Sequence, residues 1–318
     1  MATTLPSTQL PLTIEADACR SLAALLETAQ ARREAHGRAL LTHGALLFRG
    51  WSARSLDDFS AFVRAFSGSD RLFGYAGGAS PRKALAEGGL YSSTEYPPSM
   101  TLSLHNELSY ADVWPRRLFF FCLVAPREGG ETTLADSRRI LAAIDPAVAE
   151  EFRRRKIRYV RNLSPLKGSG YSWQEAFETD DAQEAEARCR RIGAAFEWRG
   201  NGILRMSQVR PATATHPETR EEVWFNQADG FHPSALDPAT YAEQLAICGS
   251  EEDFRLGVTW GDGAPIPLEA LAHVRSVLAA QALGHRWREG DILVLDNLLA
   301  AHGRAPFAGP RKIALAMA

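Results

Sequence analysis

Apolar side chains recur at helical spacing near the start of the chain. Between residues 15 and 34 they lie at positions 19, 22, 25, 26 and 29, which predicts an amphipathic helix ending near His36-Gly37. The short apolar run at 45–48 predicts a buried strand, and the helical period returns over 56–66. Residues 12–70 are therefore expected to form a helix, a strand and a second helix.

Later segments predict a β core with helices around it. The runs 118–125, 291–295 and 312–318 are apolar throughout, as buried strands are, and helical periods occupy 138–155, 182–192 and 268–283. Between residues 68 and 98, Gly, Ser, Pro and Tyr dominate without a sustained period, which predicts a long loop over a pocket. The sequence has no repeat and no flexible tether, so we expect one domain over residues 1–318.

Composition favours a folded protein with a small-molecule partner. The chain has 318 residues, of which 45% are hydrophobic and 23% charged, enough to bury a substantial core. A net charge of -2 offers no large basic field for nucleic acid or an anionic membrane, so neither is expected as a partner. The basic run at 153–158 is interpreted as a solvated helix face leading into a strand.

Cysteine spacing and the N-terminus point to a reduced compartment. Cys19, Cys122, Cys189 and Cys248 form no C-x-x-C pair, so neither a zinc knuckle nor a disulfide framework is indicated. Residues 1–11 lack the basic and apolar regions of a secretory signal, and no apolar run approaches the roughly 20 residues that span a bilayer. We expect a cytoplasmic location.

One set of residues suggests a metal site. His105-Asn106-Glu107 is followed much later by Asp296-Asn297 and His302-Gly303-Arg304. On a strand, His105 and Glu107 would project from the same face while Asn106 points away. Two imidazoles and one carboxylate on one face of a metal are typical of non-haem Fe(II) oxygenases. A catalytic zinc site for hydrolysis uses similar ligands, and a metal-binding module without turnover is a further alternative.

The surrounding motifs extend this pattern to a family. Residues 91–98 (Tyr-Ser-Ser-Thr-Glu-Tyr-Pro-Pro), the His-Asn-Glu motif, residues 126–136 with Gly-Gly-Glu-Thr, residues 224–227 (Trp-Phe-Asn-Gln) and residues 296–311 occur in this order. Together they cover roughly residues 40–318. The sequence resembles the taurine-dioxygenase-like (TauD/TfdA) family of Fe(II)- and 2-oxoglutarate-dependent oxygenases. This resemblance implies a double-stranded β-helix, or jelly-roll, with helices packed outside.

The resemblance also implies roles for individual residues. His105, Glu107 and His302 would hold Fe(II), leaving positions for 2-oxoglutarate and O2. Arg311 matches the arginine that binds the far carboxylate of 2-oxoglutarate, a task that suits a planar guanidinium, and Thr132 matches the hydroxyl that assists it. Asn106, Asn226 and Arg304 are candidates for contacts with the substrate, and structural hydrogen bonding is an open alternative for the two asparagines.

The expected reaction is hydroxylation of an unactivated C–H bond, with 2-oxoglutarate converted to succinate and carbon dioxide. Related iron halogenases replace the carboxylate ligand by a small residue, so Glu107 disfavours halogenation, whereas desaturation, epoxidation and rearrangement remain open. The motifs are most similar to the syringomycin-type branch, which implies an amino-acid substrate in specialised metabolism, free or bound to a peptidyl carrier protein. Taurine fits less well, because the family's sulfonate-binding arginine would fall at Leu315. Oligomeric state cannot be predicted from these residues.

Overall fold

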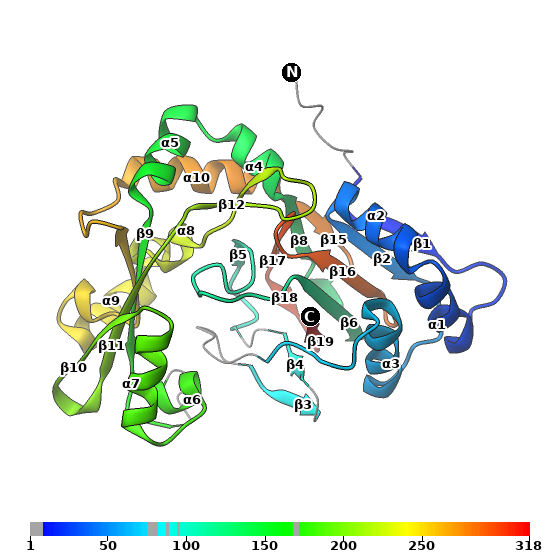
Figure 1. Cartoon of the computed structure of the whole chain (residues 1–318), viewed down its shortest axis with the longest axis horizontal. Coiled ribbons are helices and arrows are strands. Elements are labelled where there is room, and N and C mark those ends of the chain that lie inside the picture. The colour runs from blue at the N-terminus through cyan, green and yellow to red at the C-terminus, as the bar shows by residue number, and fades with distance from the viewer. Residues whose placement is uncertain (1–8, 75–81, 87–88, 94–95, 168–171) are drawn as a thin grey trace.

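The largest sheet has seven strands in the order β1-β2-β16-β6-β19-β4-β3 (Figure 1). The computed structural model describes residues 9–74, 82–86, 89–93, 96–167 and 172–318. The strands of this sheet are β1 Leu12–Glu15, β2 Ala45–Arg49, β16 Ile292–Asp296, β6 Arg117–Val124, β19 Lys312–Met317, β4 Leu90–Ser92 and β3 Ala84–Ala86. The apolar runs at 45–48, 118–125, 291–295 and 312–318 thus form its four neighbouring strands β2, β16, β6 and β19, which confirms the prediction of strands there.

Burial on both faces explains why these strands are apolar throughout. In β6, Phe119 and Phe121 pack against the N-terminal helices, whereas Leu118, Phe120 and Cys122 face the core on the other side. The same alternation divides β2, β16 and β19 between the two cores. Successive side chains of a strand point to opposite faces. When both faces of the sheet are covered, all of these side chains are buried, and the strand is therefore apolar at consecutive positions.

A second sheet completes the jelly-roll. Its order is β15 (Leu283–His285), β8 (Thr132–Asp136), β17 (Ala300–Arg304) and β5 (Leu102–His105), and β17 is antiparallel to both of its neighbours. Leu134 and Ala300 from this sheet join the core that lines the inner face of the large sheet. The two sheets therefore pack face to face, as the jelly-roll prediction requires.

The N-terminal helices cover the outer face of the large sheet (Figure 1). The expected helix over 15–34 is wrong in its limits: α1 (Leu22–Ala31) starts where the Ser21 hydroxyl accepts the amide N–H of Ala24, and residues 12–15 are strand β1. A second helix, α2 (Arg33–His43), continues past His36-Gly37 and ends at Gly44 in the left-handed conformation (φ 74°). Helix α3 (Leu56–Ser67) matches its prediction and begins with a capping box between Ser55 and Asp58.

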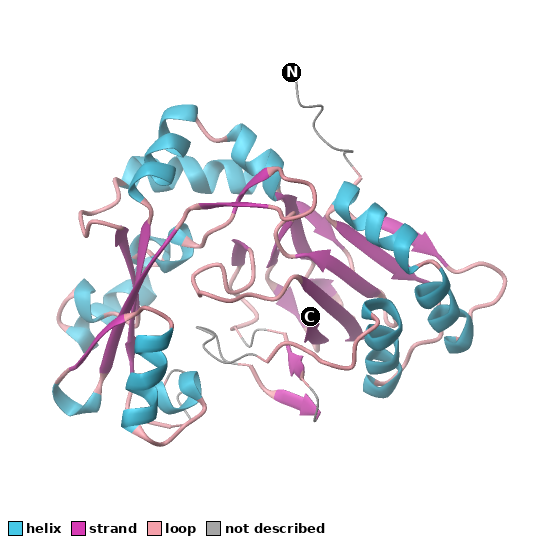
Figure 2. Cartoon of the chain, in the orientation of Figure 1, coloured by secondary structure: helices cyan, strands magenta, loops and turns pink. Residues whose placement is uncertain are grey.

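A third sheet, not predicted from the sequence, lies apart from the jelly-roll (Figure 2). It has the order β10 (Ala195–Trp198), β11 (Leu204–Arg210), β9 (Ile157–Leu163) and β14 (Leu256–Trp260). Helices α6 (Trp173–Phe177) and α7 (Ala182–Arg191) pack on one face. The other face shares a core with α4 (Ser137–Ala143), α5 (Pro146–Arg155), α8 (Ala228–Phe231) and α10 (Leu268–Gln281). The remaining elements are α9 Pro238–Cys248, β7 Glu128–Gly129, β12 Thr213–Thr215, β13 Glu222–Trp224, β18 Phe307–Ala308 and three short 3-10 helices at Gly200–Gly202, Pro233–Ala235 and Glu251–Asp253.

Two other predicted segments differ in detail. The helix expected over 138–155 is divided in two, because the Asp145 side chain caps a new helix that has Pro146 in its first turn. The loop expected over 68–98 contains strands β3 and β4, and its residues 75–81, 87–88, Thr94 and Glu95 lie outside the described residues. The helices predicted at 182–192 and 268–283 are α7 and α10.

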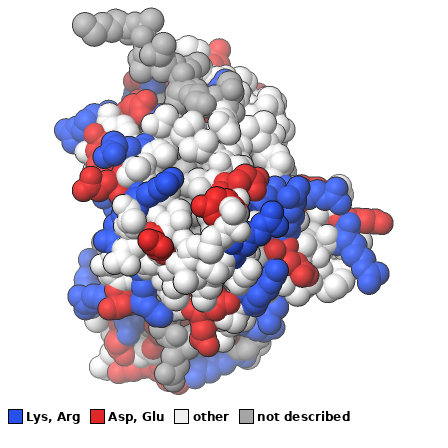
Figure 3. Space-filling model, turned by 90° about the vertical axis from the view of Figure 1, so that its right-hand side faces the viewer, with Lys and Arg blue, Asp and Glu red and all other residues white. Residues whose placement is uncertain are grey.

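Charged side chains form mixed patterns. On the face shown in Figure 3, basic and acidic side chains lie next to one another. In the basic run at 153–158, Arg153 and Arg155 end helix α5 and make ion pairs with Glu222 and Asp262. Among the described residues, no helix has both the length and the apolar composition needed to cross a bilayer.

Candidate metal and cosubstrate site

The three proposed metal ligands meet between β5 and β17. His105 ends β5 and pairs in register with His302 of β17, and their ring centroids are 4.3 Å apart. The Nε2 atom of His302 lies 3.7 Å from Oε2 of Glu107. One ligand atom from each of the three residues falls within 4.8 Å of the others, so a single ion can contact all three.

Glu107 reaches this point from a turn, which corrects the expectation that it shares a strand face with His105. Strand β5 ends at His105, and Leu108 adopts a left-handed conformation (φ 56°). Asn297 holds the turn: its Oδ1 accepts the Glu107 N–H at 2.7 Å and its Nδ2 donates to the Glu107 carbonyl at 2.9 Å. The reverse bond runs from Asn106 Nδ2 to the Asn297 carbonyl, at 2.7 Å.

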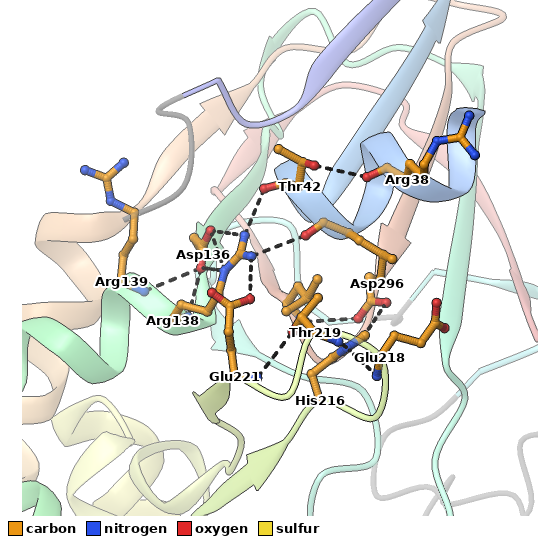
Figure 4. Close-up of polar contacts among 12 residues, drawn as sticks. Arg38, Thr42, Asp136, Arg138, Arg139, His216, Glu218, Thr219, Glu221 and Asp296 are labelled. Carbon is orange, nitrogen blue, oxygen red and sulfur yellow. Dashed lines mark hydrogen bonds and ion pairs between the residues drawn. The ribbon is translucent and has the colours of Figure 1, made fainter. Parts of the chain in front are cut away.

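The segment that carries Asn297 is fixed in turn by a buried pair (Figure 4). His216 Nε2 lies 3.1 Å from Oδ2 of Asp296, while His216 Nδ1 accepts backbone N–H groups from Glu218 and Thr219. The proton of this ring therefore sits on Nε2 and points at Asp296. Oδ1 of Asp296 accepts the N–H groups of Leu298 and Leu299, which completes the turn leading into β17.

A second buried network ties the end of α2 to β8 (Figure 4). Arg138 makes ion pairs with Asp136 at 2.7 Å and Glu221 at 3.0 Å, and donates to the carbonyls of Leu41 and Thr42. Each of these contacts is buried or partly buried. The network closes the end of β8 opposite Thr132 and so fixes the strand that lies beside His302.

Both imidazoles suit metal binding. His105 Nδ1 lies 2.9 Å from the Ser103 carbonyl, so it carries the proton and leaves Nε2 as the ligand atom. Burial lowers the pKa of His105 and lowers that of His302 well below its ordinary value, which favours the neutral rings that metals bind. Buried Nδ1 of His302 has no hydrogen-bond partner among the described residues.

Arg82 is a site residue that the sequence did not reveal. Its Nη2 donates to Oε2 of Glu107 at 2.6 Å, and both side chains are buried. Arg82 comes from the segment expected to lie over a pocket. Arg82 and Ser93, both from this segment, line a small cavity beside His302. That placement confirms the interpretation of this segment, but no motif distinguishes Arg82 from a surface arginine.

The predicted cosubstrate residues share that cavity with His302. It has a volume of about 30 Å³ and is lined by Arg311, Thr132 and Arg82, among others. Arg311 donates to the Gly130 carbonyl at 3.1 Å, and Thr132 Oγ1 accepts the indole N–H of Trp287 at 3.0 Å. Among the described residues, no carboxylate forms an ion pair with Arg311. Burial, reinforced by the charge of Arg304, lowers the pKa of Arg311 to about 10, and a bound carboxylate would relieve this cost.

The three residues with proposed substrate contacts bind the protein itself. Asn106 donates to Ser137 and Asn297, and Asn226 donates to the Ala212 carbonyl and accepts the Ala228 N–H. Arg304 donates to three backbone carbonyls, those of Tyr96, Pro97 and Met100. Both asparagines thus make the structural hydrogen bonds that were the alternative. Arg304 fixes the 96–100 loop while also lining the cavity with Arg311.

Gly303 allows the close approach of the strands that carry the ligands. A Cβ atom at this position would lie 2.5 Å from the Leu102 carbonyl oxygen and 2.6 Å from Thr133 Oγ1. The register between β17 and β5 shifts at this residue, between His302 and Arg304. Only glycine lets β17 pass so near both neighbours.

Comparison with known proteins agrees with this geometry. The model of the Taurine catabolism dioxygenase TauD, TfdA family matches residues 6–317. Dapdiamide synthesis protein DdaC of Enterobacter agglomerans is 39% identical over 274 residues, which are 86% of this chain and 82% of DdaC. A clavaminate synthase-like protein of Arabidopsis thaliana is 29% identical over 316 residues, 97% of this chain and 90% of that protein.

A solved structure confirms the fold. PvcB from Pseudomonas aeruginosa superposes with a TM-score of 0.55 at 17% identity, covering 97% of this chain and 85% of PvcB. PvcB is an Fe, α-ketoglutarate-dependent oxygenase from an isonitrile synthetic pathway. The family match, the fold and the clustered His, Glu and His side chains lead to one conclusion. The chain belongs to the Taurine catabolism dioxygenase TauD, TfdA family and is an Fe(II)- and 2-oxoglutarate-dependent oxygenase.

Proposed function

We propose that this enzyme hydroxylates an unactivated C–H bond of an amino acid or an amino-acid-derived molecule in specialised metabolism. His105, Glu107 and His302 would hold Fe(II), and Arg311 with Thr132 would bind the far carboxylate of 2-oxoglutarate. The observation that carries the proposal is the convergence of these two sets: His302, Thr132 and Arg311 line one cavity, and His302 also lies beside Glu107. DdaC, named for dapdiamide synthesis, supports an assignment to specialised metabolism.

Iron and 2-oxoglutarate, when bound, would supply the oxidising power for a reaction in which 2-oxoglutarate, O2 and the substrate give succinate, carbon dioxide and the hydroxylated substrate. The chain contributes position and exclusion of water. The two hydrogen bonds from the Asn297 side chain to the Glu107 backbone orient Glu107, and the Ser103 carbonyl orients His105. Arg311 orients the cosubstrate in a buried cavity. Glu107 occupies the position that halogenases leave open for chloride, which favours oxygen insertion. Leu315 has an uncharged side chain and is fully buried in β19, so this position provides no cation that could bind a sulfonate.

The direct test uses enzyme purified anaerobically, loaded with Fe(II), and supplied with 2-oxoglutarate and O2. We expect succinate formation, accelerated by the correct substrate and accompanied by a mass gain of one oxygen in the product. His302→Ala should abolish iron-dependent turnover and leave the circular dichroism spectrum unchanged. His43→Ala, which alters a histidine of α2 outside the ligand set, should preserve both the turnover and the spectrum. Metal-dependent hydrolysis without oxygen consumption would show a zinc-type hydrolase instead.

A further inference from the structure

A second cavity lies on the His105 side of the proposed metal position. It has a volume of about 120 Å³ and is lined by His105, whereas the cavity that contains Arg311 is lined by His302. Its walls are partly apolar, with Leu104, Phe231 and Leu256, and partly charged, with Asp229 and Arg255. His105 thus borders a cavity that the cosubstrate residues do not line. A substrate placed there would present its carbon skeleton to the metal from the side away from Arg311.

Asp229 is a buried carboxylate that makes no ion pair among the described residues. It lies in α8 and is 5% exposed. The charge of Arg275, whose guanidinium donates to the Asp229 carbonyl oxygen at 3.0 Å, favours the ionised carboxylate, as do the backbone N–H groups of Gly230 and of Asp229 itself. Among the described residues, no side chain donates a hydrogen bond to this carboxylate. A buried acid with so few partners is costly to ionise and is suited to a cationic ligand.

Arg255 brings the opposite charge to the same cavity. It lies just before β14 and is mostly buried, which lowers its pKa, and it interacts with the phenol of Tyr96, another lining residue. A guanidinium offers paired donors that match a carboxylate. The cavity is therefore lined by one anionic and one cationic side chain among polar and apolar residues.

We infer that this cavity binds the charged head of a free α-amino acid, with the ammonium group at Asp229, the carboxylate at Arg255 and the side chain directed toward His105. The inference rests on the proposed function and refines its substrate. An aminoacyl thioester on a carrier protein keeps the ammonium group but has no carboxylate for Arg255. The pair therefore selects the free amino acid over the carrier-bound form.

The experiment compares matched compounds on the wild-type enzyme with Fe(II) and 2-oxoglutarate. Succinate formation and substrate mass gain are measured with each of the free proteinogenic L-amino acids. The best substrate is then compared with its N-acetyl derivative, which lacks the ammonium charge, and its methyl ester, which lacks the carboxylate. We expect a free amino acid to accelerate succinate formation, and each blocked form to raise KM at least about tenfold, the loss expected for one charge-assisted hydrogen bond.

Two variants assign the effect to individual residues. Asp229→Asn should raise KM for the free amino acid at least about tenfold and remove the preference over the N-acetyl compound, and Arg255→Gln should do the same for the methyl ester. Matched controls are Asp57→Asn and Arg191→Gln, which make the same chemical changes on exposed side chains of α3 and α7 and should keep the wild-type preferences.

The outcomes separate the two proposals. The inference is overturned when no free amino acid accelerates turnover while the enzyme still forms succinate slowly without substrate. It is equally overturned when the blocked compounds work as well as the free ones, or when both variants keep the wild-type preferences. Absence of succinate under every condition contradicts the proposed function itself.

Discussion

Asn297 is expected to position the metal ligand Glu107, and its replacement tests this role. The side chain is fully buried and makes three hydrogen bonds to backbone groups: the Glu107 N–H, the Glu107 carbonyl and the Pro115 carbonyl. Asn297→Ala removes all three at once. The turn that presents Glu107 then keeps the bond from Asn106 Nδ2 to the backbone carbonyl of position 297 but loses the two bonds that hold the Glu107 backbone.

The expected magnitude follows from the groups left without partners. A buried backbone group that loses its hydrogen bond costs about 1–3 kcal/mol, so three such groups set a range of about 3–9 kcal/mol. Water entering the vacated space lowers this sum, and single substitutions seldom exceed about 4–5 kcal/mol. We expect a loss of about 3–4 kcal/mol in unfolding free energy. We also expect Fe(II) affinity to fall about 10- to 100-fold, as when other outer partners of metal ligands are removed.

Asn226→Ala provides the matched control. Asn226 is also a buried asparagine bonded to backbone groups, but those belong to Ala212 and Ala228 rather than to Glu107. Urea unfolding should show a loss of stability in both variants, whereas anaerobic calorimetric titration with Fe(II) should show weaker binding only for Asn297→Ala. Equal Fe(II) affinity in the two variants would refute the positioning role and leave Asn297 as a purely structural residue.

Three further predictions follow from the same geometry. Burial raises the pKa of Asp229 to about 6, so ionisation destabilises the fold by about 3 kcal/mol as pH rises from 4 to 7. Asp229→Asn should therefore unfold at higher urea than wild type at pH 7.5 and lose this advantage at or below pH 4; equal stability at both pH values would contradict the burial argument. Arg311→Lys should raise KM for 2-oxoglutarate about 10- to 100-fold because one ammonium cannot reproduce two parallel hydrogen bonds, and an unchanged KM would exclude Arg311 from cosubstrate binding. Gly303→Ala should cost about 1–3 kcal/mol in urea unfolding because of its contact with the Leu102 carbonyl, and wild-type stability would show that β17 adjusts freely.

Individual strands of the large sheet could be predicted where burial alone determines the sequence, whereas the jelly-roll itself followed from the family resemblance. β6 and β16 are apolar on both faces because each lies between two cores. β9 in the third sheet has the sequence Ile-Arg-Tyr-Val-Arg-Asn-Leu, which gives no such pattern. Its Arg161 is buried by tertiary contacts, over the Tyr110 ring at 5.6 Å and beside Met206. The pattern of residues along β9 gives no information about these tertiary contacts. The third sheet therefore could not be predicted from that pattern.

The structure brings the three proposed metal ligands together, but the physical reason given for their grouping was incomplete. The spacing of His105 and Glu107 suggested two residues on one strand face, whereas β5 stops at His105 and Asn297 holds Glu107 from 190 residues away. Arg82 was missed for a similar reason, because its importance lies in one contact with Glu107. The limits of the single domain remain a prediction, and the proposed experiments address the roles of the individual site residues.

Two buried arginines of the structural networks differ in their ion pairing from the charged residues of the cavities. Arg138 contacts Asp136 and Glu221, and Arg49 pairs with Asp291 at 2.6 Å. Along the two cavities, by contrast, Arg311 and Asp229 form no ion pair with the described residues. Burying an uncompensated charge destabilises a fold, so these residues are explained better by ligands than by packing. A dicarboxylate at Arg311 and an ammonium group at Asp229 would restore neutrality on both sides of His105 and His302.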